Sequence, residues 1–152
     1  MEAVGRNGIP HAFLQKALPN IETEINNILG QIVDFNISLN MNGKNITGLL
    51  NYDFDRIWPL ENSSGMERFV SSLAIRVALL KASNLPKPNF LIIDEGLGTL
   101  DSENLQNMSN LMNILKTHFD FILMVSHLDS ARDMVDNLLE IRRDNGYSYI
   151  NV

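Results

Sequence analysis

The chain has 152 residues, no cysteine and a formal net charge of −6 at pH 7. A chain of this length forms one domain with its own core, the lack of cysteine excludes a disulfide framework and a thiolate metal site, and the acidic balance argues against a broad basic nucleic-acid face on this chain. No apolar run reaches the roughly 20 residues of a membrane span and the first residues do not have the plan of a signal peptide, so we expect a soluble cytoplasmic protein that does not contact a membrane.

The first half of the sequence predicts two helices with a hairpin between them. In residues 17–35 the apolar residues recur at helical spacing, which predicts an amphipathic helix. Residues 35–41 alternate between apolar and polar, and the following Asn42-Gly43 is a hairpin-turn signal. After an extended piece and a loop, an apolar stripe from Met66 predicts a long helix, which the two prolines of "NLPKPN" must end.

The second half alternates strands and helices. Residues 90–93 and 121–125 are apolar without interruption, and both segments are predicted to be short strands, buried on two faces in a parallel sheet. An amphipathic helix is expected between them at 101–119, and a short helix follows at 129–137. The Asn-Gly pair at 145–146 predicts a C-terminal hairpin. This order of elements predicts an α/β fold with a parallel core.

Polar residues of catalytic type follow both predicted strands. The first strand runs into Asp94-Glu95, and the second runs into Ser126-His127. The two ends should be neighbours if a right-handed crossover helix joins the strands, and ligand sites in open α/β sheets collect at such ends. Adjacent carboxylates point in opposite directions from a strand, so one can face a metal and the other a reacting water. Two simpler interpretations stay open at this point: the acids can mark a polar loop, and His127 can be a structural or surface histidine.

A third feature precedes the long helix. Ser63 and Ser64 are good N-cap residues, and Gly65 allows close backbone approach. A helix N-terminus with free N–H groups and a serine hydroxyl favours an anion. Taken alone, the segment is better explained as an ordinary capped helix. Its position ahead of the two strand ends favours a phosphate site instead.

In order, "SSGME", a long helix, "FLIIDEGLGTLD" and "VSH" resemble the C-terminal lobe of an ABC-type ATPase head. The resemblance is to the SbcC family of double-strand-break repair ATPases, which are related to the structural-maintenance-of-chromosomes (SMC) proteins, and to similar phage recombination-endonuclease subunits. It implies the C-terminal half of a P-loop NTPase head, with a mainly parallel sheet, flanking helices and a β-hairpin near each end. Residues 1–19 would end a coiled coil or linker that enters the head, and residues 20–152 would form the ATPase lobe.

The resemblance also implies roles for the residues at the start of the long helix. Ser64, Gly65 and Glu67 would belong to the signature motif, which binds the ATP held by the opposite head. Met66 stands where the family has a second glycine, so a side chain is added beside the phosphate contact. The resemblance therefore implies ATP as the cofactor and a second copy of the head as a partner.

At the strand ends the resemblance implies the chemistry of ATP hydrolysis. Asp94 would hold Mg²⁺, and Glu95 would polarise the attacking water. Asp101 would lie in the loop that crosses the dimer interface, and His127 would sense the γ-phosphate. These roles suit phosphoryl transfer, in which positioning and charge stabilisation supply most of the catalysis.

The sequence contains no G-x-x-x-x-G-K-[ST] phosphate loop and no long heptad region. Gly43-Lys44 is better explained as part of a hairpin turn. We therefore expect an N-terminal ATPase lobe with the Walker A loop to complete the head, and the chain alone to be inactive. By the same resemblance, the intact protein would bind ATP between two heads, clamp DNA and control an SbcD-like nuclease.

Two other functions fit part of the pattern. A non-catalytic, SMC-like module for dimerisation or DNA tethering would use the same fold, but it would need neither Glu95 nor His127. A Mg²⁺-dependent phosphoryl-accepting domain would need an acceptor aspartate and a lysine at other strand ends, and the sequence does not offer that arrangement.

Overall fold

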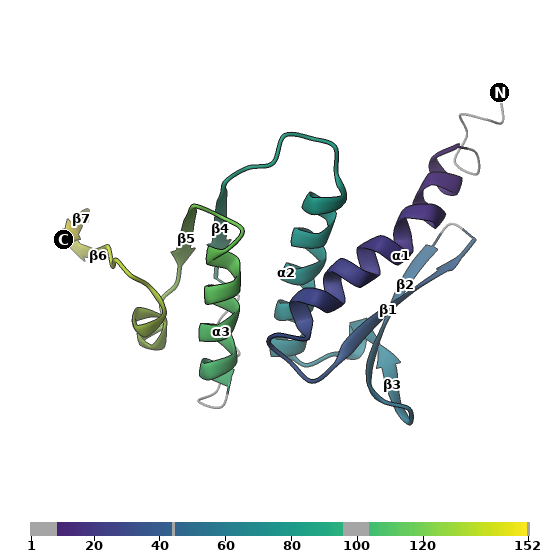
Figure 1. The fold of residues 1–152 in the computed structure, drawn as a ribbon. Coiled ribbons are helices and arrows are strands. Elements are labelled where there is room, and N and C mark those ends of the chain that lie inside the picture. Colours follow the sequence, from purple (N-terminus) through teal and green to yellow (C-terminus); the bar gives the residue numbers. More distant parts are fainter. Residues whose placement is uncertain (1–8, 44, 96–103, 152) are drawn as a thin grey trace.

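The structure is a computed structural model that describes residues 9–43, 45–95 and 104–151. The element order is a helix, three antiparallel strands, a second helix, a strand–helix–strand unit and a C-terminal hairpin. Figure 1 shows the first helix crossing the second beside the three strands, with the third helix next to the second and the hairpin at the far end. Among the described residues, no helix has the length and apolarity needed to cross a bilayer.

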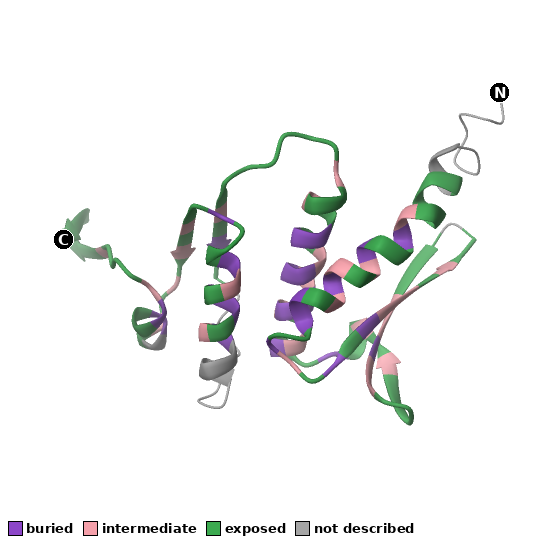
Figure 2. Ribbon diagram, in the orientation of Figure 1, coloured by how far each residue is buried: buried purple, intermediate pink, exposed green. Residues whose placement is uncertain are grey.

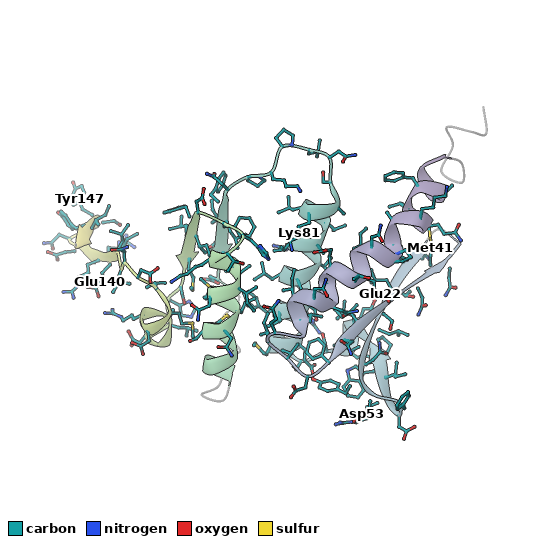
Figure 3. All side chains as sticks on the ribbon, in the orientation of Figure 1. Glu22, Met41, Asp53, Lys81, Glu140 and Tyr147 are labelled. Carbon is teal, nitrogen blue, oxygen red and sulfur yellow. The ribbon has the colours of Figure 1, made fainter. Side chains whose placement is uncertain are left out.

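The N-terminal half is built around helix α1 (Ile9–Leu29). Its buried residues recur at helical spacing and face the core. The predicted hairpin is confirmed as the start of an antiparallel meander, in which β1 (Asn36–Asn42) pairs with β2 (Asn45–Asp53) and β2 pairs with β3 (Arg56–Pro59). Side-chain hydrogen bonds attach α1 to the sheet; Figure 3 shows Glu22 on α1 beside the strands.

Helix α2 (Gly65–Ala82) follows a short 3₁₀ turn, η1 (Leu60–Asn62), and its predicted apolar stripe is confirmed. The stripe packs against α1, and Figure 2 shows buried positions concentrated where α1, α2 and α3 face the interior. The largest fully buried side chains come from both halves of the chain: Ile25, Leu29, Ile37, Leu50, Val70, Ser71, Met108, Leu111 and Leu115. One continuous core therefore joins the helices to the sheet.

The strand–helix–strand unit confirms the predicted parallel pairing. Strand β4 (Phe90–Asp94) pairs in parallel with β5 (Phe121–Val125), and α3 (Asn104–Lys116) connects them. The short 3₁₀ helix η2 (Asp129–Met134) follows, and the predicted terminal hairpin forms as β6 (Glu140–Asp144) and β7 (Tyr147–Asn151). Its turn has positive φ at Asn145 and Gly146, as an Asn-Gly hairpin turn requires.

The prediction that β4 and β5 are buried on both faces is wrong for the described chain. Leu91, Ile93, Ile122 and Met124 face the core, whereas alternate residues on the other face are exposed, with Phe90 at 52%, Ile92 at 55% and Phe121 at 60%. The apolar composition fits a covered sheet, but within the described residues the helices cover only one side. Figure 2 shows the outer part of this unit mainly as exposed.

Two element boundaries also differ from expectation. The first helix begins at Ile9 rather than near residue 17, so Pro19 lies inside it. It ends at Leu29, and the turn at Gly30 to Ile32 carries the chain into the sheet while still burying Ile32. Periodicity identified the helix but not its ends, because a buried residue just beyond a helix continues the apolar pattern.

Candidate functional site

The carboxyl ends of β4 and β5 form one edge of the parallel sheet. Asp94 lies opposite Val125, and the Glu95 N–H donates a hydrogen bond of 2.9 Å to the Val125 carbonyl, which extends the pairing by one step. Ser126 and His127 leave β5 beside this point. The expectation that the two polar strand ends are neighbours is therefore confirmed.

Glu95 and His127 face each other across this edge. The distance from His127 Nδ1 to Glu95 Oε1 is 3.6 Å, and the two side chains are 72% and 69% exposed. This separation is too long for a direct hydrogen bond, and the exposure leaves both groups open to solvent and to a ligand. The arrangement can direct a carboxylate and an imidazole at one small polar molecule.

Glu95 has an unusual backbone conformation. Its φ is +56°, in the left-handed region that residues other than glycine, asparagine and aspartate rarely adopt. Such a conformation costs of order 1–3 kcal/mol and is concentrated at functional sites. The chain thus leaves β4 through a strained residue whose side chain faces His127.

The segment that carries His127 is shaped by a local hydrogen bond. The Leu128 N–H donates to Ser126 Oγ at 3.1 Å, so Ser126 forms a side-chain turn around the histidine. Leu128 itself packs against the core. These two contacts fix the backbone on each side of His127 and leave the imidazole exposed.

Asp94 supplies a second carboxylate at the edge, and it is exposed. Within the described residues, no group of three or more His, Cys, Asp or Glu side chains is close enough together to hold a metal ion by itself. Mg²⁺ commonly uses only one or two protein carboxylates and takes its other ligands from water and substrate phosphates. The oxygen donors present here suit that ion. Asp101 lies outside the described residues.

The N-terminus of α2 is a fully formed capping box. Glu67 N–H donates to Ser64 Oγ at 3.4 Å, and Ser64 N–H donates to Glu67 Oε2 at 2.6 Å. Gly65 and Met66 occupy the first helical positions, where N–H groups have no acceptor within the helix. This end of the helix therefore presents donors and a partial positive charge that favour an anion.

The loop before α2 is held by its neighbours. Arg68 donates from Nη2 to the carbonyl oxygens of Glu61 at 3.0 Å and Ser63 at 3.2 Å. The buried Ser63 donates its hydroxyl to the Leu60 carbonyl at 2.7 Å. These bonds fix the backbone just ahead of Ser64.

The structure adds Tyr52, which the sequence did not single out. Its hydroxyl donates a hydrogen bond to Glu67. The S-x-x-E spacing of Ser64 and Glu67 is a sequence signal for the capping box, but nothing in the local pattern marks Tyr52. Its contact with Glu67 bridges a sheet and a helix, so only the fold could reveal it.

The predicted site residues thus form two groups. Asp94, Glu95 and His127 meet at the edge of the parallel sheet, while Ser64 begins the first turn of α2. Among the described residues, no side-chain hydrogen bond or ion pair joins the two groups. Figure 1 shows the start of α2 and the carboxyl ends of β4 and β5 directed toward the same side of the molecule.

Relatives by sequence include proteins of double-strand-break repair. The chain is 37% identical over 160 residues to the uncharacterized protein R555 of Acanthamoeba polyphaga mimivirus, covering 95% of this chain and 12% of that protein. It is 30% identical to the SbcC component of the SbcCD nuclease of Pseudomonas aeruginosa, in an alignment that covers 64% of this chain and 8% of that protein. It is 31% identical to the double-strand break repair Rad50 ATPase of Pyrococcus abyssi, in an alignment that covers 62% of this chain and 11% of that protein. The chain thus spans about a tenth of the length of these relatives. No family model matches it.

Solved structures of SMC heads have the same fold. A structure from work on ATP-driven dimerization and DNA-stimulated activation of SMC ATPases aligns with a TM-score of 0.73 and 16% identity, covering 93% of this chain and 87% of that one. The Smc head domain with a coiled coil from Pyrococcus yayanosii aligns with a TM-score of 0.70 and 18% identity, covering 93% and 28%. By sequence and by fold, the chain is therefore similar to the C-terminal lobe of an SbcC-like, SMC-related ABC-type ATPase head.

Proposed function

We propose that the chain is the C-terminal ATP-binding-cassette lobe of a DNA repair or recombination ATPase. In this function two heads enclose ATP, and each C-terminal lobe supplies a signature motif, a Walker B strand end and a switch histidine. The observation that carries the proposal is the pairing of Glu95 with His127 at 3.6 Å, with Glu95 in a strained backbone conformation at the end of a parallel strand. A pure scaffold has no need of that arrangement.

Each residue would act through its own chemistry. Glu95 would accept a hydrogen bond from the attacking water and orient it toward the γ-phosphate. His127 would donate a hydrogen bond to the same phosphate and thus report its presence. Asp94 would hold Mg²⁺, whose charge, when the ion is bound, offsets that of the phosphates. Asp101 would contact the opposite head beside Glu95.

The signature turn would bind the ATP of the opposite head. Ser64 and Gly65 lie where the helix dipole and free N–H groups favour phosphate, and Glu67 completes the cap. Met66 is buried, with 7% of its surface exposed. Its side chain therefore points into the core and not toward the phosphate side, so the missing second glycine does not block the approach of ATP.

The partner with the Walker A loop would cover the exposed face of the parallel sheet. Parallel sheets occur almost only with both faces covered, and β4 and β5 expose Phe90, Ile92, Phe121, Leu123 and Val125 on one side. We propose that the N-terminal ATPase lobe packs there. An SbcD-like nuclease is proposed as a further partner because the Pseudomonas relative is named as part of the SbcCD nuclease. A second head and DNA are proposed because the structural neighbour comes from work on ATP-driven dimerization and DNA-stimulated activation of SMC ATPases.

The test is Glu95→Gln in a head assembled from this chain and a lobe with the Walker A loop. We expect hydrolysis to fall by at least about 100-fold, since a positioned base commonly contributes that much, while ATP-bound dimers accumulate. Steady-state phosphate release and size-exclusion chromatography with ATP measure the two effects. Glu61→Gln, the same exchange at an exposed site in η1, is the matched control and should retain both activities.

The same experiment separates the proposal from its alternative. If Glu95→Gln hydrolyses ATP as fast as the parent head, the catalytic role is wrong. If the parent head forms dimers without hydrolysing ATP at all, the chain is a dimerisation or tethering module instead.

A further inference from the structure

Tyr52 lies in β2 where the pairing with β3 shifts register. The shift falls between Asn51 and Asp53, so Tyr52 is the extra residue of a β-bulge. Tyr52 keeps the face of β2 that carries the buried Leu50, and its ring packs against the core. Its hydroxyl reaches Glu67 in the first turn of α2. This hydrogen bond therefore connects the three-stranded sheet to the proposed signature turn.

The Tyr52 ring is held on several sides. Its centroid lies 5.4 Å from that of Phe35 and 5.3 Å from that of Trp58, both in tilted contacts. The Arg56 guanidinium carbon lies 5.4 Å from the ring centroid. A ring fixed in this way points its hydroxyl in one direction, so the sheet determines where the hydrogen bond to Glu67 can form.

Glu67 is shared between Tyr52 and the signature turn. Oε1 accepts the Tyr52 hydroxyl, and Oε2 accepts the Ser64 N–H at 2.6 Å. Burial raises the pKa of Glu67, but the hydrogen bonds from Tyr52 and Ser64 outweigh it and leave that pKa lowered. Burial, followed by the hydrogen bond to Glu67, raises the pKa of Tyr52 to about 12. A charged carboxylate is thus held beside the N–H groups that a phosphate would use.

We propose that Tyr52 is a positioning residue for the signature turn: by holding Glu67 it sets how tightly Ser64 and Gly65 bind the γ-phosphate of the ATP on the opposite head. The inference rests on the proposed function and adds the sheet as a determinant of ATP affinity. Without the tyrosine hydroxyl, the Glu67 carboxylate loses one of its two anchors. It then competes with the phosphate for the N–H groups and opposes it by charge.

Tyr52→Phe in the assembled head tests the proposal. We expect the ATP concentration for half-maximal hydrolysis to rise roughly three- to tenfold, the range for loss of one hydrogen bond. The rate at saturating ATP should be unchanged, because Tyr52 does not touch the reacting atoms. Tyr149→Phe, the same exchange at an exposed site in the C-terminal hairpin, is the matched control and should have no effect.

A second variant isolates the carboxylate. Glu67→Gln keeps the capping interaction, because glutamine serves at that position of a capping box, but it removes the negative charge. In the Glu67→Gln background, Tyr52→Phe should therefore change the half-saturating ATP concentration far less than it does in the parent. An equal effect in both backgrounds would mean that Tyr52 does not act through Glu67.

Titration of the Glu67 carboxyl by NMR in the assembled head separates the possible failures. If Tyr52→Phe leaves both the half-saturating ATP concentration and the pKa of Glu67 unchanged, Tyr52 is not a positioning residue. If Tyr52→Phe raises that pKa but the parent head neither binds nor hydrolyses ATP, the contact is real and the proposed function is wrong.

Discussion

The two halves of the chain are stabilised differently. In residues 9–82 the helices and the sheet cover each other and are joined by hydrogen bonds; the Asn26 amide both donates to and accepts from the backbone of Ile37, at 2.8 Å each. In the described part of the second half, residues 90–95 and 104–151, the parallel strands are covered on one face only, and the hairpin contains exposed Ile141 and Tyr147. Figure 3 shows Tyr147 on this hairpin, far from Glu22 and Met41.

The difference indicates where a partner belongs. The first half carries the proposed signature turn, and its helix α1 packs against both α2 and the sheet, although side chains such as Phe54 and Ile57 are exposed. The second half carries the proposed catalytic edge on strands whose outer face is apolar and uncovered. Contiguous exposed apolar side chains on a protein surface commonly mark an interaction site, so the partner proposed for this face would pack beside the catalytic edge.

The largest change in the free energy of unfolding should come from a substitution in the core of the first half. Ile25→Ala removes a side chain with 0% exposure that packs within the central cluster. We expect a loss of about 2–5 kcal/mol in the free energy of unfolding, because burial is lost and a cavity remains. Urea denaturation followed by circular dichroism measures it. A loss below about 1 kcal/mol would mean that this half is not the stable part of the chain.

A smaller change in the free energy of unfolding should follow from a change in pH, because the contact between Tyr52 and Glu67 depends on how each group is protonated. The pKa of Tyr52 is raised to about 12. Its contribution to the free energy of unfolding is therefore complete below the ordinary pKa of 10 and is lost as the pH rises from 10 to 12. The lowered pKa of Glu67 means that its contribution is present above the ordinary carboxyl pKa and is lost as pH falls through the lowered value.

The measurement is the urea midpoint as a function of pH for the parent and for Tyr52→Phe. We expect a difference of about 1 kcal/mol at neutral pH, typical of one hydrogen bond, which should shrink toward both pH extremes. A difference that is constant across the whole range would show that the ring matters only through packing.

The smallest change in the free energy of unfolding should come from a substitution on the uncovered strands. It gives the most direct comparison of the two halves. Ile92→Ala makes the same exchange as Ile25→Ala but at a side chain that is 55% exposed. We expect a change in unfolding free energy within about 0.5 kcal/mol, as for most surface substitutions. In the presence of the Walker A lobe, the same variant should weaken the association of the two lobes, measured by titration calorimetry. Unchanged association would place that lobe elsewhere.

The sequence by itself determined the elements and the chemistry at their ends. Helical periodicity identified α1, α2 and α3, and alternation identified β1, because a buried face must repeat with the geometry of its element. Uninterrupted apolar runs identified β4 and β5. Glycine in the Asn-Gly turns and the capping serine at Ser64 acted locally, within a few residues of the structure they specify. Asp94, Glu95 and His127 could be predicted as a group because parallel pairing brings strand ends together.

Only the tertiary structure decided which faces are covered and which side chains meet across elements. An apolar run such as residues 90–93 has the same sequence whether its second face is covered by its own chain or by a partner. The bulge at Tyr52 and the contact of Tyr52 with Glu67 depend on residues distant in the chain, and the sequence did not indicate the positive φ of Glu95. Local propensity carries no information about such contacts, because their energy exists only once the separate elements have packed together.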